Sequence, residues 1–272
     1  MFLNYIIEPF NFLFFRYAAL SMLSISLLCG ILGSYVILKR LSSFAGSIAH
    51  SSFGGIGLAL LYGFDPLLAA IGFGVSSSLL MEWIRIRFKQ DEGMLINIVW
   101  VLGMSFGIVC IQLSPGFAFD LNSFFFGNLL LISKNEILFL SALAVGIVGI
   151  NAITFRLLRA ITFDEEYSYV LNIPVRLISL FLLGCVAITT VLLIRAMGMM
   201  LVIGLLILPA ASAKNFCRSL VNIQILGSFI ALFGGTLGLY LSYYLDQASG
   251  PMIIAVLGLI YVLSLIKKKR ER

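Results

Sequence analysis

Long apolar runs alternate with short polar stretches along the whole chain. They predict membrane spans at roughly 17–38, 44–62, 66–82, 94–113, 136–157, 177–194, 197–213, 221–245 and 250–266. Each run is long enough to cross a hydrocarbon layer about 30 Å thick as an α-helix. The pattern therefore predicts an all-α polytopic integral membrane protein, with a bundle of eight or nine transmembrane helices that forms a single domain over residues 1–272.

Two segments leave the number of spans open. Residues 197–213 form a short run that contains Pro209 and follows the preceding span almost without a loop, so a broken or re-entrant segment is an alternative to a full span. Residues 2–15 have a second interpretation as a helix that lies in the membrane interface. The N-terminal residues lack the basic start and the small-residue cleavage site of a secretory signal, so we expect no cleaved leader.

Composition and charge agree with a membrane protein. Hydrophobic residues make up 61% of the chain and charged residues 11%, whereas a soluble domain carries about 25% charged residues. The net charge of +6 arises from Lys and Arg residues that lie in alternate loops and in the C-terminal tail, with Arg16, Lys134 and Arg195 as exceptions. This asymmetry predicts a cytoplasmic C-terminus and explains the basic charge without nucleic-acid binding. We call the membrane side with the excess of Lys and Arg the basic side.

Sequence motifs of catalysis are missing. The chain has no GxxxxGK[ST] phosphate-binding loop, no GxSxG nucleophile elbow and no HExxH zinc motif. Its four cysteines are scattered singly, without a CxxC pair. We therefore expect no catalytic activity, although an intramembrane enzyme that uses the single histidine and a non-transporting membrane scaffold remain alternatives.

That histidine, His50, lies in SSFAGSIAHSSFGG at residues 42–55. The interiors of the predicted spans otherwise contain no Asp, Glu, Lys or Arg. Ionisable groups inside a membrane are costly and usually face a bundle interior or a water-filled path. Neutral imidazole is also a good ligand for zinc and other divalent metals. The residues alone leave open whether His50 is a metal ligand or makes a structural hydrogen bond between helices.

The segment RAITFDEEYSYVLNIPVR, at residues 159–176 on the basic side, differs from the other loops. Thr162 and Glu165 fit the capping box T-x-x-E, which predicts a helix start. Pro174 ends the helix, so we expect a short helix at about 162–173. It is either an interfacial connector or an element that docks a partner protein. The candidate docking residues are Asp164, Glu165, Glu166, Tyr167 and Tyr169.

Four stretches together resemble the metal-ion permease family of ABC importers. KRLSSFAGSIAHSSFGGIGLAL (39–60) is similar to the second-span region of that family. The other three are SFFFGNLLLIS (123–133), FDEEYSYVLNIP (163–174) and MGMMLVIGLLILPAASAKNF (197–216). They occur in the order of the family and extend the resemblance over nearly the whole chain.

The resemblance implies a permease with the type II-like ABC importer fold, which carries zinc, manganese or iron ions. It implies a pore formed with a second copy or a paralogue, a separate cytoplasmic ATP-binding subunit, and an extracytoplasmic metal-binding protein. The location implied is the cytoplasmic (inner) membrane of a prokaryote, in contact with lipid. The metal ion would be the substrate, and no cofactor is expected on this chain. A permease for a siderophore or haem chelate is the alternative.

The resemblance also favours particular residues. His50 becomes the expected ligand in the transport pathway, with Ser47 and Ser51 as weaker oxygen donors. Residues 162–173 become the expected coupling helix for the ATP-binding subunit, and Asp120 in the long loop on the opposite side is expected to meet a delivery protein.

Two positions depart from the family pattern. Gly46 stands where many members carry an acidic residue four positions before the histidine, so the identity of the metal stays open. Asn172 stands where the family usually has glycine, and asparagine tolerates the left-handed conformation of a helix end.

Overall fold

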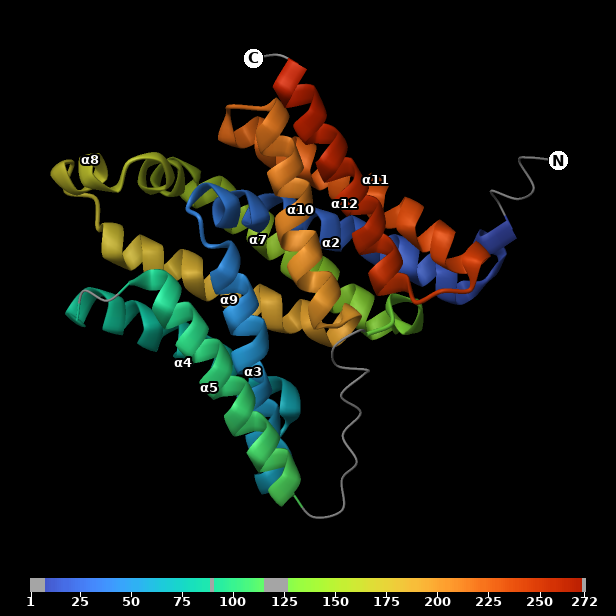
Figure 1. The fold of residues 1–272 in the computed structure, drawn as a ribbon, viewed down its shortest axis with the longest axis horizontal. Coiled ribbons are helices and arrows are strands. Elements are labelled where there is room, and N and C mark those ends of the chain that lie inside the picture. Colours follow the sequence, from blue (N-terminus) through green and yellow to red (C-terminus); the bar gives the residue numbers. More distant parts are fainter. Residues whose placement is uncertain (1–7, 89–90, 115–126, 271–272) are drawn as a thin grey trace. The chain divides into compact units, whose positions relative to one another are not determined.

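The computed structural model describes residues 8–88, 91–114 and 127–270, nearly all of them in helices (Figure 1). No strand forms within these ranges, as the all-α class predicts. The elements, in chain order, are the 3-10 helix η1 (Glu8–Asn11), α2 (Leu13–Leu38), α3 (Ser42–Tyr62), α4 (Pro66–Phe88), α5 (Glu92–Leu113), the 3-10 helix η2 (Leu129–Leu131), α7 (Lys134–Phe163), α8 (Glu165–Val170), α9 (Val175–Met197), α10 (Met199–Phe216), α11 (Leu220–Leu245) and α12 (Ser249–Arg270).

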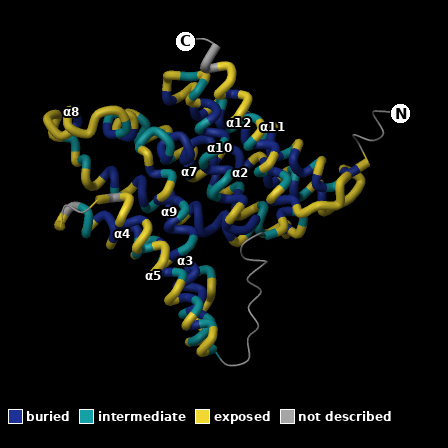
Figure 2. The backbone as a smooth tube through the Cα atoms, in the orientation of Figure 1, coloured by how far each residue is buried: buried dark blue, intermediate teal, exposed yellow. Residues whose placement is uncertain are grey.

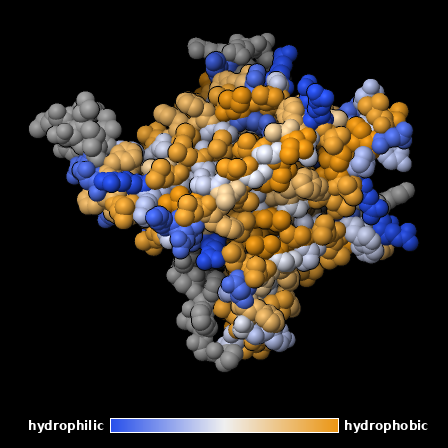
Figure 3. Space-filling model, turned by 180° about the vertical axis from the view of Figure 1, so that it is seen from behind, coloured by the Kyte–Doolittle hydropathy of each residue, from blue (hydrophilic) through white to orange (hydrophobic). Residues whose placement is uncertain are grey.

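Nine of the described helices are long and apolar enough to cross a membrane, in agreement with the predicted spans. Figure 3 shows hydrophobic side chains over most of the visible face. The expectation of span interiors without charged residues is wrong. The candidate span Lys134–Phe163 includes Arg156 and Arg159, and the span Pro66–Arg85 includes Glu82, because α4 continues past residue 82. The buried side chain of Glu82 accepts a hydrogen bond of 2.6 Å from Arg85, one helical turn further on, which compensates its charge.

The segment after α9 is a helix in its own right. α9 and α10 are separated only by Gly198, whose φ of 83° is accessible to glycine and strained for other residues. α10 continues through Pro209 without a break, and its 18 residues give a length of about 27 Å. The structure therefore favours a span over a broken or re-entrant segment. In the described part of 2–15, η1 ends at Asn11 and α2 begins at Leu13, so these residues do not form one interfacial helix.

The chain forms two compact units. Unit 1 comprises Met1–Ile37, Asn122–Ile153 and Ala196–Arg272. Its helices α10, α11 and α12 pack against one another. Three uncharged side chains link α2, α7 and α11: the Tyr35 hydroxyl donates to Asn151 Oδ1 at 2.6 Å, and the amides of Asn151 and Gln224 lie 3.4 Å apart. Such hydrogen bonds compensate polar groups that lipid cannot solvate.

Unit 2 comprises Leu38–Leu121 and Thr154–Arg195. Within it α3 packs most extensively on α5 and α4. The backbones approach closely: a Cβ atom on Gly57 would lie 2.5 Å from the carbonyl oxygen of Gly107, and one on Gly55 would lie 2.3 Å from that of Ala69. Small residues permit this approach in lipid, where apolar area alone does not hold helices together. Within unit 2 the span of α3 is 72% buried, against 33% for α4 and 28% for α5, and Figure 2 marks the buried positions in dark blue.

Candidate functional site

His50 lies on α3 within unit 2 and is half-buried. Its imidazole stacks on the indole ring of Trp100 from α5, with ring centroids 4.3 Å apart and planes 21° from parallel. The Trp100 side chain is 39% exposed, so the ring pair lies at the edge of the packed helices. An aromatic stack of this kind restricts the orientation of the imidazole.

Ser47 and Ser51 lie on the side of α3 that packs against α5. The Ser47 hydroxyl donates to the carbonyl of Ile96 at 2.9 Å, and the Ser51 hydroxyl donates to the carbonyl of Ile48 at 3.2 Å. Both serines are at most 1% exposed. Each oxygen retains lone pairs, but both are enclosed between the helices, whereas His50 is not. Their predicted role as weak oxygen donors therefore stays a prediction.

Gly46, one turn before His50, supplies no carboxylate at the position where a second ligand would share the helix face. Among the described residues no cluster of three or more His, Cys, Asp and Glu side chains is suited to a metal ion. Within that part of the chain, His50 is thus not part of a preformed metal cluster. A single imidazole ligand suits brief contact with a passing cation better than tight retention.

Trp100 is a candidate functional residue that sequence reasoning missed. It lies in an apolar span and has no charge, and its partner is 50 positions away in the chain. The available signal was weak: the chain has only two Trp residues, and Trp100 precedes Gly103 and Gly107, which mark the packing face of α5.

The second predicted site, α8, forms the turn between α7 and α9 (Figure 1). The predicted capping box is wrong, because α7 continues through Thr162, whose hydroxyl donates to the carbonyl of Leu158. Asp164 is the N-cap instead and accepts from the Tyr167 amide at 2.8 Å. α8 is only six residues long. Asn172 has a φ of 57°, which confirms the left-handed conformation expected of it.

The five predicted docking residues separate into three groups. Asp164 caps the helix, and Glu165 forms an ion pair with Lys39. The remaining three are exposed: Glu166, Tyr167 and Tyr169. Tyr167 is 61% exposed and Tyr169 is 77% exposed, and Val170 and Leu171 continue this apolar surface. The structure thus provides an aromatic and aliphatic surface with one carboxylate. Asp120 lies outside the described residues.

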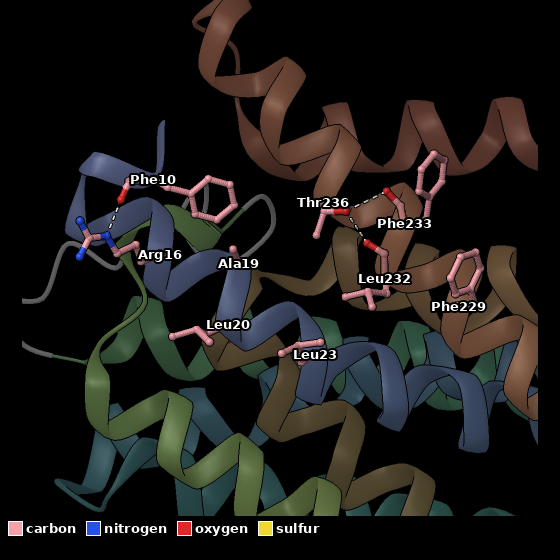
Figure 4. A pocket seen from close by; sticks show the side chains of 9 residues that line it. All are labelled: Phe10, Arg16, Ala19, Leu20, Leu23, Phe229, Leu232, Phe233 and Thr236. Carbon is pink, nitrogen blue, oxygen red and sulfur yellow. Dashed lines mark hydrogen bonds between the residues drawn. The ribbon is translucent and has the colours of Figure 1, made fainter. Parts of the chain in front are cut away.

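A groove of about 580 Å³ lies within unit 1 between α2 and α11 (Figure 4). Leu20, Leu23 and Phe233 are among its apolar lining residues. Arg16 donates to the carbonyl of Phe10, and the hydroxyl of Thr236 bonds to carbonyls of its own helix. None of the nine lining residues has a carboxylate, thiol or imidazole. Apart from the Thr236 hydroxyl, the groove therefore offers no side-chain ligand for a metal ion.

Comparisons with known proteins agree over nearly the full length. The model of the ABC 3 transport family matches residues 11–268. A probable metal transport system membrane protein of Chlamydia trachomatis is 35% identical, over 90% of this chain and 85% of its own length. The high-affinity zinc uptake system membrane protein ZnuB of Haemophilus influenzae is 26% identical, over 93% and 97%. PsaBC from Streptococcus pneumoniae, solved in complex with Fab, shares the fold with a TM-score of 0.85 and 24% identity, over 97% of this chain and 95% of that chain.

Proposed function

The chain belongs to the ABC 3 transport family, and we propose that it is the membrane-spanning permease of an importer for divalent transition-metal ions. The observation that carries this proposal is the family match over residues 11–268, which includes all nine candidate spans. As a member of this family the chain is a transport subunit and not an enzyme. The zinc uptake of one relative supports a free metal ion, such as zinc, manganese or iron, as the substrate.

His50 is the proposed contact between the protein and the ion. Neutral imidazole binds zinc and other borderline divalent metals through nitrogen. A transported ion must bind well enough to enter and weakly enough to leave. One imidazole per chain, positioned by Trp100, fits that requirement. If two chains form the pore, each would contribute one histidine to the pathway.

The exposed surface of α8 is the proposed docking site for a separate ATP-binding subunit. Aromatic side chains that are buried on association contribute strongly to protein interfaces. The basic side, on which α8 lies by the charge pattern, would then face the cytoplasm together with the C-terminus. The proposed location is the inner membrane of a prokaryote, and the proposed role of Asp120, on the opposite side by the charge pattern, is contact with a metal-delivery protein.

Transport by reconstituted vesicles tests the substrate class. The chain and its ATP-binding subunit would be placed in proteoliposomes, with the delivery protein added outside and ATP inside. We expect ATP-dependent accumulation of radioactive zinc, manganese or iron. Accumulation of iron-siderophore or haem without accumulation of any free ion would overturn the proposal in favour of a chelate permease.

Copurification tests the docking site. Tyr167→Ala with Tyr169→Ala removes two exposed rings from α8 and should release the ATP-binding subunit during affinity purification of the complex. Tyr62→Ala is the matched control, because Tyr62 is 67% exposed but lies at the far end of α3. Equal recovery of the ATP-binding subunit with both variants would contradict the docking role.

A further inference from the structure

Lys39 connects the turn between α2 and α3 to the start of α8. Its ammonium group donates to the carboxylate of Glu165 and lies 3.5 Å from the carbonyl oxygen of Ile161 near the end of α7. The Lys39 side chain is only 8% exposed, whereas the Glu165 side chain is 46% exposed. An ammonium group with so little access to water needs its partners, so Lys39 and Glu165 are expected to stay together when either segment moves.

The turn that carries Lys39 has little capacity to absorb a displacement. Only three residues separate Leu38, the last residue of α2, from Ser42, the first of α3. Arg40, in the middle, has a φ of 61°, a left-handed conformation that costs energy for a residue with a side chain. A displacement of Lys39 is therefore expected to move the start of α3, because the short turn between them cannot absorb it.

α3 in turn carries His50. His50 is eight residues after Ser42, which is about 12 Å along a helix. α3 is also held closely to α5, where a Cβ atom on Gly103 would lie 2.6 Å from the Cα atom of Ser51. Helices in such contact move together, so a displacement at the start of α3 reaches both His50 and Trp100.

A polar pocket of about 310 Å³ lies beside the Lys39–Glu165 pair. Its lining includes Lys39, Glu165, Ser179 and the Glu82–Arg85 ion pair at the end of α4. A polar space can hold water while the surrounding helix ends shift, and no apolar core has to open. The Lys39–Glu165 pair thus joins helix ends of unit 2 that can shift at a small cost in free energy.

We propose that the Lys39–Glu165 pair is the mechanical link that carries displacement of α8 into α3 and hence to His50. This proposal rests on the proposed function, and it assigns Glu165 an internal positioning role that differs from docking. The two residues would determine how many ions are transported for each ATP hydrolysed, without contacting the ion or the nucleotide.

The test compares transport, ATP hydrolysis and subunit recovery in the reconstituted complex. Lys39→Met and Glu165→Gln should each lower the number of ions transported per ATP by about tenfold, with the ATP-binding subunit still bound. The double variant Lys39→Glu/Glu165→Lys should recover much of that ratio. Arg40→Asn is the matched control, because it removes a charge from the same turn and keeps a residue that accepts the left-handed conformation.

Different results would contradict the Lys39–Glu165 link and the proposed function as a metal-ion permease. Normal ion-to-ATP ratios in both single variants would overturn the link, and loss of the ATP-binding subunit in Glu165→Gln would make Glu165 a docking residue instead. Failure of the unmodified complex to transport any free metal ion would overturn the proposed function. In that case a second measurement still tests whether the Lys39–Glu165 pair couples α8 to α3.

That second measurement needs no transport. Spin labels at Ser43→Cys on α3 and Tyr169→Cys on α8, in a chain without its four native cysteines, report the distance between the two helices in nanodiscs. Both positions are exposed. Lys39→Met should broaden the distance distribution relative to the unmodified lysine, and Arg40→Asn should not. An unchanged distribution in Lys39→Met would overturn the link.

Discussion

Unit 1 and unit 2 differ in the chemistry of their polar side-chain contacts. In unit 1, α2, α7 and α11 are joined by uncharged groups, the Tyr35 hydroxyl and the amides of Asn151 and Gln224. In unit 2, the Lys39–Glu165 and Glu82–Arg85 ion pairs lie around a polar pocket, and the single histidine stacks on an indole ring. Uncharged hydrogen bonds hold helices together whether or not a cation is present, whereas charges and imidazole respond to ions and partners. We infer that unit 1 mainly provides cohesion and that unit 2 carries the responsive groups.

The largest effect on stability is expected in the glycine contact of unit 2. Gly57→Ala would place a Cβ atom 2.5 Å from the carbonyl oxygen of Gly107 and 2.9 Å from its Cα atom, both backbone atoms that cannot rotate away. Separating α3 from α5 should cost about 1–3 kcal/mol or more and lower the midpoint of thermal unfolding in detergent. Gly72→Ala is the control, because nothing lies within 4 Å of the added atom. Equal midpoints for the two variants would show that this contact is not tightly packed.

A smaller effect, confined to transport, is expected at the indole ring. Trp100→Leu removes the stack on His50 and should lower ion uptake about two- to twelvefold, the range that corresponds to roughly 0.5–1.5 kcal/mol of lost aromatic contact. The amount of protein in the membrane should not change. Trp83→Leu replaces the other tryptophan, which is 49% exposed and contacts Phe88. If Trp83→Leu lowers uptake as much as Trp100→Leu, the positioning role of Trp100 is wrong.

The smallest effect is expected in unit 1. Gln224→Leu removes one amide and leaves the 2.6 Å hydrogen bond between Tyr35 and Asn151 in place. Hydrogen bonds between membrane helices contribute about 0.6 kcal/mol on average, so the unfolding midpoint should fall slightly and uptake should persist. Uptake lost from a well-folded Gln224→Leu variant would contradict the division between a cohesive and a responsive unit.

The spans were predictable because they depend on local sequence, and a run of apolar residues has few alternatives to a membrane helix. The boundary between α9 and α10 was expected at residues 194–197 and lies at Gly198 instead, where the positive φ favours glycine. The start of α8 was predicted less well, because Thr162 and Asp164 are both good capping residues two positions apart. The continuation of α7 through Phe163 decides between them, and that continuation depends on packing.

The contacts of the candidate site were not predictable, because they join distant parts of the chain. His50 was identified from its own chemistry, but Trp100 and the Lys39–Glu165 pair require knowledge of which helices are neighbours. Lys39 and Glu165 are 126 positions apart, and nothing in their local sequences distinguishes them from other charged residues on the basic side. The separate roles of Asp164, Glu165 and Glu166 likewise follow from the direction of each side chain, which three consecutive acidic residues do not reveal.

The central claim is that His50 contacts the transported ion. The most direct test is energy-dependent uptake of radioactive zinc and manganese by cells that lack the native chain and produce either the unmodified protein or His50→Ala at equal membrane levels. The account predicts that His50→Ala lowers uptake to that of cells without the chain, while the ATP-binding subunit still copurifies. Normal uptake of both ions by His50→Ala would contradict it.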